Sequence, residues 1–215
     1  GDTNYSWPAE ALNACTWNKD LMFQRGNAGA DIAHHSSVND GMDGWYAPAT
    51  NIHRSPFGQR ASEYFAEDGY LAGHMAGSVA YGMESKGIMC TIKHYALNEN
   101  ENHRQNVHTY VTEQAAREIY FKPFQIAMQE YGCHATMTSY NAIGEVHSSV
   151  NYKFMQAMTR DEWGFNGLSV TDALTPSNAY MTADMMFRSG SDLILSSFTS
   201  NKTYLAPSGY YDVED

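Results

Sequence analysis

Residues 163–172 read WGFNGLSVTD, a turn followed by a short apolar run that ends on Asp172. A carboxylate at the carboxyl end of a buried strand is where parallel β/α proteins place their chemistry. The alternative interpretation is that Asp172 caps the helix that follows, since Asp is a good N-cap residue. Three earlier segments of the chain end in the same way, and this repetition favours the functional interpretation.

Strand-like and helix-like segments alternate along the chain, which predicts a parallel sheet with helical crossovers. Pro123 should kink or divide one of these helices. Besides the run that ends at Asp172, strands are expected at 45–48, 88–92, 134–139 and 192–195, and helices at 7–33, 68–87, 112–128, 152–163 and 180–188. The polar residues expected at the strand ends are Asn51, Lys93, His94, Tyr140 and Asp172.

A (β/α)8 TIM-type barrel accounts for this arrangement, because the carboxyl ends of its strands form the catalytic face. An open doubly wound sheet is the alternative, but it usually carries a glycine-rich phosphate loop, and none is visible in the sequence. A complete barrel needs about 250 residues and eight strands, whereas this chain has 215 residues. We therefore expect residues 1–195 to form part of a barrel and residues 196–215 to be a tail or linker within a larger protein.

Composition excludes several classes of protein. Hydrophobic residues make up 43% of the chain and charged residues 17%, as in a globular protein. A net charge of −11 argues against a nucleic-acid partner, because phosphates would be repelled. No apolar run is long enough to span a membrane. The three cysteines, Cys15, Cys90 and Cys133, lack CxxC spacing and are expected to be reduced core residues, which favours a cytoplasmic location and leaves localisation otherwise open.

The candidate chemistry centres on Asp172, which could act as a nucleophile or a general base. Arg60 and Arg104 could keep it ionised, since a cation within about 4–6 Å lowers a carboxyl pKa by about 1–3 units. Lys93 and His94 offer donors suited to sugar hydroxyls, phosphate or a carboxylate. The alternative interpretation of Lys93 is an ordinary surface lysine, and that of His94 is a structural histidine.

Other titratable residues are not expected to be functional. Glu99 and Glu101 lie in the loop after Lys93 and His94, and we expect them to be solvated rather than catalytic. Nine histidines raise the question of a metal site. The loop histidines nevertheless lack a recognisable ligand spacing, so we expect neither a metal nor another cofactor.

Five motifs, in order along the chain, resemble the barrel domain of glycoside hydrolase family 3, the retaining β-glucosidases and their relatives. Residues 7–26 also resemble the helix that precedes these motifs in the family. The motifs are YAPATNIHR (46–54), similar to APxxNIxRxP; EYFAED (63–68), similar to EYYSED; KHYALNENENHR (93–104), similar to KHFALNxQExNR; MTSYN (137–141), similar to MSAYN; and EWGFNGLSVTD (162–172), similar to EWGFxGxxxSDW.

The resemblance implies a role for each matching position. Asp172 falls on the nucleophile, which attacks the anomeric carbon of a glycoside or oligosaccharide, a glucoside above all, to form a covalent glycosyl-enzyme. Tyr140 falls on a tyrosine beside the nucleophile, and Met137 on a wall of the sugar subsite. The residues that fall on ligands of the sugar are Arg60, Lys93, His94 and Arg104.

Departures from the family pattern concern the leaving-group side and the second catalytic carboxyl group. Gln59 replaces a glycine, the Asn-Phe pair after the arginine is Ala61-Ser62, and Ala173 replaces the aromatic residue after the nucleophile. An early sugar-binding Asp is absent from the sequence, as is the second domain that carries the acid/base glutamate. The loop at 93–103 does not match the Asp-His dyad of the single-domain branch. The alternative to a glycosidase is a non-catalytic sugar-binding barrel in which Asp172 only binds hydroxyl groups.

Overall fold

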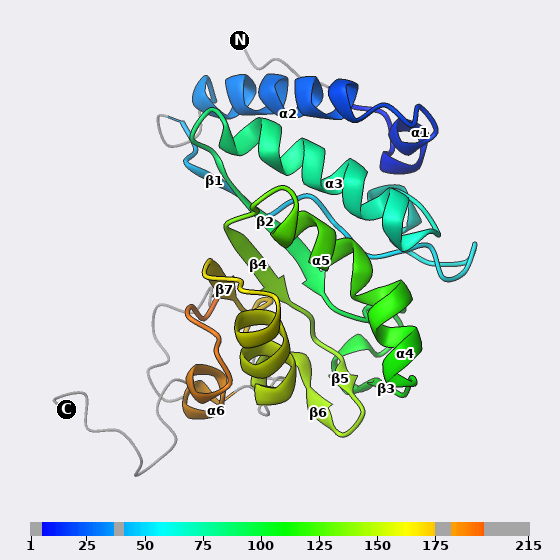
Figure 1. Ribbon diagram of the computed structural model, residues 1–215, viewed down its shortest axis with the longest axis vertical. Coiled ribbons are helices and arrows are strands. Elements are labelled where there is room, and N and C mark those ends of the chain that lie inside the picture. Colours follow the sequence, from blue (N-terminus) through cyan, green and yellow to red (C-terminus); the bar gives the residue numbers. More distant parts are fainter. Residues whose placement is uncertain (1–5, 37–40, 175–181, 196–215) are drawn as a thin grey trace, which may run out of the picture.

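The computed structural model describes residues 6–36, 41–174 and 182–195 (Figure 1). Its centre is a parallel sheet of four strands in the spatial order β1-β2-β4-β7. At least one helix precedes each strand after the first, so that successive parallel strands are joined by helical crossovers of the βαβ type. The strands are β1 (Gly44–Trp45), β2 (Met89–Tyr95), β4 (Ala135–Thr138) and β7 (Leu168–Val170).

Helices follow one another along one side of this sheet in the same order as the strands (Figure 1). The α-helices are α1 (Glu10–Ala14), α2 (Lys19–His34), α3 (Gly69–Glu84), α4 (Glu113–Ala115), α5 (Lys122–Gln129) and α6 (Ala183–Arg188). Two segments are π-helical, η3 (Ala116–Tyr120) and η5 (Lys153–Glu162), and three are short 3₁₀ turns, η1 (Ala61–Glu63), η2 (Arg104–Asn106) and η4 (Ser148–Val150). This is part of a (β/α) barrel of the TIM type, as the sequence predicted.

The backbones of helices α2 and α3 are in direct contact at Gly26 and Gly82. A Cβ atom placed on Gly82 would lie 2.2 Å from the carbonyl oxygen of Phe23, and one placed on Gly26 would lie 2.2 Å from that of Val79. Neither position has room for any residue other than glycine. Helix α3 itself begins where the sequence predicted, because the Asp68 side chain accepts a hydrogen bond from the backbone N–H of Leu71 at 2.7 Å.

The main core lies between the sheet and the helices that follow β2 and β4. Cys90, Ile92 and Tyr95 of β2 are fully buried there, with Phe124 of α5 and Phe154 of η5. The Tyr95 ring lies 4.9 Å from the Phe124 ring and 4.1 Å from the Phe154 ring, centroid to centroid. Aromatic contacts of this kind add to the stability that their buried area gives, so Tyr95 fixes the end of β2 that carries His94.

A second, small sheet lies beyond the carboxyl ends of β2 and β4 (Figure 1). It consists of β3 (His108–Thr109), β5 (Ala142–Ile143) and β6 (Val146–His147), with β3 and β5 parallel and β5 and β6 antiparallel. It joins the loop that follows β2 to the loop that follows β4. This sheet therefore helps to shape the mouth of the main sheet.

The helix predicted for residues 112–128 is divided as expected, with Pro123 in the first turn of α5. Other predicted elements differ in extent. The N-terminal helix is broken into α1 and α2 at Trp17, whose φ is +54°. The strand expected at 45–48 is shorter, and the chain meets β2 again at a single bridge between Ala49 and Lys93.

The prediction of a fifth strand at 192–195 is wrong, because this segment forms only one parallel bridge, between Leu193 and Val170. The start of the helix expected at 180–188 and the whole tail at 196–215 lie outside the described residues. Cys90 and Cys133 are buried, as expected, but the prediction for Cys15 is wrong because it is exposed. No helix in the described ranges is long and apolar enough to cross a membrane.

Candidate active site

The carboxyl ends of β2, β4 and β7 bring the predicted residues to one edge of the sheet. The imidazole Nε2 of His94 lies 3.6 Å from the carboxylate Oδ2 of Asp172. The two residues come from strands on either side of β4, whose Met137 is buried between them in the order of the sheet. The expected convergence of His94 and Asp172 is confirmed. Lys93 and His94 lie inside β2, not after it, because the strand runs on to Tyr95.

Asp172 is a buried carboxylate, and within the described part of the chain only one of its two oxygens accepts a hydrogen bond. Its exposed fraction is 8%. Oδ1 accepts a hydrogen bond from the backbone N–H of Ala173 at 2.7 Å, whereas Oδ2 has no hydrogen-bond partner within the described part of the chain. The distance from Oδ2 to His94 is too long for a hydrogen bond. An oxygen left without donors in a buried site is available to a reacting atom.

The electrostatics of Asp172 differ from the sequence-based expectation. Burial raises its pKa above the ordinary value, while the charges of Arg104, Arg60 and Lys93 act in the opposite direction. We expected the arginines to hold the group ionised with a lowered pKa, and the net direction is upward because desolvation is the larger effect. The nearby cations thus offset part of the cost of burying a carboxylate.

His94 is held at both its backbone and its ring. The Asn51 side chain accepts a hydrogen bond from the His94 backbone N–H at 2.7 Å and donates one to its carbonyl oxygen at 3.1 Å. Nη1 of Arg60 lies 3.4 Å from Nδ1 and 3.3 Å from Nε2 of the ring. Burial, followed by the charges of Arg60, Lys93 and Arg104, lowers the pKa of His94 well below its usual range. The imidazole is therefore neutral and can donate one hydrogen bond to a hydroxyl group.

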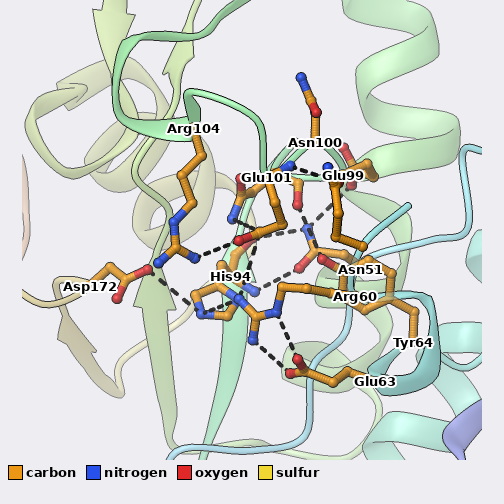
Figure 2. A network of polar contacts seen from close by, with 12 residues as sticks. Asn51, Arg60, Glu63, Tyr64, His94, Glu99, Asn100, Glu101, Arg104 and Asp172 are labelled. Carbon is orange, nitrogen blue, oxygen red and sulfur yellow. Dashed lines mark hydrogen bonds and ion pairs between the residues drawn. The ribbon is translucent and has the colours of Figure 1, made fainter. Parts of the chain in front are cut away.

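A chain of ion pairs runs from η1 to the loop after β2 (Figure 2). Arg60 binds Glu63 through two hydrogen bonds of 2.8 and 2.6 Å and lies 3.8 Å from Glu101. Arg104 donates to Glu101 at 2.8 Å, and its guanidinium lies over the ring of Tyr140 at 4.7 Å from the centroid. Each arginine is therefore fixed by a carboxylate that is not Asp172, and each keeps donors that point toward the centre of the site.

Glu99 and Glu101 correct a prediction, since both were expected to be solvated. Glu101 is part of the ion-pair chain, and its side chain is 18% exposed. Glu99 is buried and accepts a hydrogen bond from the Asn51 amide at 3.2 Å. Burial raises the pKa of Glu99 to about 7. The i, i+3 spacings from Arg60 to Glu63 and from Glu101 to Arg104 are the signals in the sequence that could have revealed these pairs.

Tyr140 and Lys93 complete the site. The Tyr140 hydroxyl donates to the carbonyl oxygen of Ala173 at 2.6 Å, which fixes the backbone next to Asp172. Lys93 lines a hollow with Glu63 and with the aromatic residues Trp7 and Trp45. Burial lowers the pKa of Lys93. No cluster of three or more His, Cys, Asp or Glu residues in the described ranges is arranged to hold a metal ion.

An incomplete parallel barrel with a buried carboxylate and several fixed cations at the carboxyl ends of its strands defines the chain as a barrel protein with an enzyme-type site. The chain belongs to glycosyl hydrolase family 3: the family model described as the glycosyl hydrolase family 3 N-terminal domain matches residues 5–205.

The chain is similar to several β-glucosidases of this family. It is 38% identical over 172 residues to β-glucosidase A of Butyrivibrio fibrisolvens and 41% identical over 172 residues to β-glucosidase B of Emericella nidulans, in both cases covering 80% of this chain and 20% of the relative. Among solved structures, β-glucosidase 3B of Thermotoga neapolitana in complex with glucose superimposes with a TM-score of 0.81 at 35% identity, covering 90% of this chain and 26% of that one. The chain thus spans about a fifth of the length of these curated relatives.

Proposed function

We propose that this chain provides the nucleophile and most of the sugar-holding residues of a retaining β-glycosidase that acts on glucosides. The observation that supports this most directly is the carboxylate of Asp172, buried at the end of β7 with Oδ2 unpartnered in the described part of the chain. In a retaining mechanism such a group attacks the anomeric carbon and forms a covalent glycosyl-enzyme. The β-glucosidase names of the relatives, and the glucose complex of the Thermotoga neapolitana enzyme, support a glucoside as substrate.

The surrounding residues have separate roles in this proposal. Neutral His94 and the cations Arg60, Lys93 and Arg104 hold the hydroxyl groups of the sugar next to Asp172. Because Arg60 and Arg104 are already fixed by Glu63 and Glu101, little side-chain freedom is lost when the sugar binds. Met137 forms an apolar wall, and Tyr140 keeps the nucleophile's backbone in place through Ala173.

Retaining hydrolysis needs a second carboxyl group about 5–5.5 Å from the first. In the described ranges, the two carboxylates of the ion-pair chain, Glu63 and Glu101, are both bound to arginines, and Glu99 is buried against the Asn51 amide. The hydrogen bonds from Arg60 lower the pKa of Glu63, which makes it a poor proton donor, and Glu101 is already bound to Arg104. We therefore propose that a further domain of the full-length protein supplies the general acid, and that residues 1–195 are the barrel portion and 196–215 a tail or linker.

The experiment that tests the proposal is covalent labelling of the full-length protein with a dinitrophenyl 2-deoxy-2-fluoro-β-glucoside. The fluorine slows both steps while the activated leaving group lets the first proceed, so the ester accumulates. We expect one label per active site, on Asp172, and none in Asp172→Asn. Glu67→Gln, a change at an exposed carboxylate, should label as the unmodified protein does.

Two outcomes would contradict the proposal. Peptide mapping that places the label on another carboxylate overturns the role of Asp172. Absence of any label, together with glucose binding that persists in Asp172→Asn, supports a non-catalytic sugar-binding barrel instead.

A further inference from the structure

A buried hydrogen-bonded path leads from Glu99 to His94 (Figure 2). The carboxylate Oε1 of Glu99 accepts from Nδ2 of Asn51 at 3.2 Å, and the same Nδ2 donates to the carbonyl oxygen of His94 at 3.1 Å. The other end of the Asn51 amide, Oδ1, accepts from the His94 backbone N–H at 2.7 Å. Asn51 is fully buried, so these bonds decide which way its amide faces.

The orientation of this amide matters because its two bonds to the His94 backbone lie where the pairing of β2 with β4 is irregular, between Ile92 and Tyr95. If Asn51 turned away, the His94 N–H and carbonyl groups would lose the hydrogen bonds that its amide gives them, which is unfavourable for buried polar groups. The imidazole, 3.6 Å from Asp172, would move with the backbone. Sites that do chemistry tolerate displacements of only about 0.5 Å.

Glu99 has access to solvent on the side away from Asp172. It borders a cavity of about 280 Å³ that is lined also by Arg54, Asn100, His108 and Tyr110. Asp172 does not line this cavity. Protons can therefore reach Glu99 without passing through the sugar subsite.

We propose that Glu99, in its ionised form, is a positioning residue that fixes His94 against Asp172 through the Asn51 amide. This role deepens the proposed function and rests on it for its catalytic meaning. A bond from an amide to a carboxylate is charge-assisted and stronger than one to a neutral carboxyl group. Ionised Glu99 therefore holds Nδ2 of Asn51 more firmly and keeps Oδ1 directed at the His94 N–H.

The charge of Glu99 changes in the physiological range because burial raises its pKa to about 7, while Arg54 and the Asn51 hydrogen bond act to lower it. The groups that face it are Arg54 from the preceding loop, Tyr64 from the segment after η1, and His108 and Tyr110 across the cavity. Positioning of His94 should accordingly improve as the pH rises through about 7.

The first test measures the position of His94 without reference to catalysis. Full-length protein labelled with ¹³C at the histidine ring is titrated by NMR from pH 5 to 9, and the His94 signal is assigned by its loss in His94→Gln. Since burial holds the pKa of His94 well below its usual range, an inflection of its signal near pH 7 reports a neighbour. We expect this inflection to vanish in Glu99→Gln, which keeps the shape and the acceptor oxygen, and to persist in the surface control Glu67→Gln.

The second test measures the labelling rate with the dinitrophenyl 2-fluoro glucoside over the same pH range. Its dinitrophenyl leaving group departs without protonation by a general acid. The pH profile of the labelling rate therefore does not contain the titration of the general acid. We expect the rate in unmodified protein to rise through pH 7, and the rate in Glu99→Gln to be flat and lower by about 10- to 100-fold at pH 8.

The two tests separate the positioning role from the proposed function. Failure of unmodified protein to label would reject the proposed function, and the NMR titration would still decide whether Glu99 acts on His94. If the protein labels but Glu99→Gln keeps both the His94 inflection and the pH profile of the rate, the positioning role is overturned.

Discussion

The loop after β2 and the end of β7 each bring one carboxylate toward the same two arginines, and they use it in opposite ways. Glu101 in the loop accepts from Arg104 at 2.8 Å, lies 3.8 Å from Arg60 and accepts a weaker bond from Asn98 at 3.4 Å. Asp172 feels the charges of both arginines but accepts only from its neighbour's backbone through Oδ1, and Oδ2 is unpaired within the described ranges. Geometry, not charge, thus separates a structural carboxylate from one available for reaction.

The largest effect should come from removing the reactive carboxylate. Asp172→Asn keeps the volume of the side chain and removes the attacking oxygen, so we expect turnover of nitrophenyl β-glucoside by the full-length protein to fall on the order of 10⁴-fold or more. Glucose affinity, measured by calorimetry, should change much less, because Arg60, Lys93 and His94 remain. A variant that retained more than about 1% of the turnover would show that the two carboxylates do not differ as proposed.

The burial of a third carboxyl group, that of Glu99, should make the free energy of unfolding depend on pH. Its folded-state pKa of about 7 lies above the ordinary value of 4.5, so between these values the folded protein binds a proton more tightly than the unfolded chain. The contribution of Glu99 to the free energy of unfolding should therefore be fully present below pH 4.5 and fall by about 3 kcal/mol as the pH rises to 7 and above.

Glu99→Gln should remove this dependence. Guanidinium unfolding of the two proteins at pH 4.5 and pH 8 checks it: the difference in unfolding free energy between variant and unmodified protein should shift in favour of the variant at the higher pH. An unchanged difference would mean that Glu99 is solvated, as the sequence alone suggested.

Removing the charge of the structural carboxylate, Glu101, should have an intermediate effect on activity. Glu101→Gln loses a charge-assisted bond to Arg104, worth about 1.5–3 kcal/mol, and should lower kcat/KM by about 10- to 100-fold. The matched control is Glu113→Gln, which removes a pair of the same length, 2.8 Å to Arg117, on the surface. Exposed pairs contribute about 0–1 kcal/mol, so the control should be nearly neutral in both activity and stability.

The smallest effect should come from the support of the Asp172 backbone. Tyr140→Phe removes the hydroxyl that donates to Ala173 and keeps the ring that lies under Arg104. The loss of one hydrogen bond of about 1 kcal/mol should reduce kcat/KM about fivefold. Tyr152→Phe, at an exposed position, serves as control. A loss beyond about 100-fold would give Tyr140 a more direct role than backbone support.

The sequence predicted the parallel sheet and the edge at which its polar residues gather, because alternating apolar runs and helical periodicity are local signals. His94 and Asp172 could be placed together for the same reason: neighbouring parallel strands bring their carboxyl ends to one edge. The resemblance to family 3 motifs then supplied a role for each of these residues, which the labelling and variant experiments are designed to test.

The loops were harder to predict, because nothing in their periodicity shows which polar residues turn inward. Glu99 and Glu101 look alike in a run of polar residues. Only the positions of Asn51 and Arg60, more than 35 residues earlier in the chain, decide that Glu99 is buried and Glu101 partly buried. The pKa of Asp172 was assigned the wrong direction for a related reason: the number of nearby cations is visible in the sequence, whereas the depth of burial is not. The prediction of a regular strand at 192–195 failed because its apolar run is only three residues long, 193–195, and so short a run does not specify pairing.

The contact between Gly26 and Gly82 limits how such a protein can change over evolutionary time. Because a single methyl group at either position would meet a carbonyl oxygen 2.2 Å away, α2 and α3 can drift in sequence only around a shared, invariable point of contact. The loops at the mouth carry exposed side chains such as Phe57 and have no such restriction. New substrate preferences are therefore open to selection at the mouth, whereas Gly26 and Gly82 in the outer helices have to remain glycine.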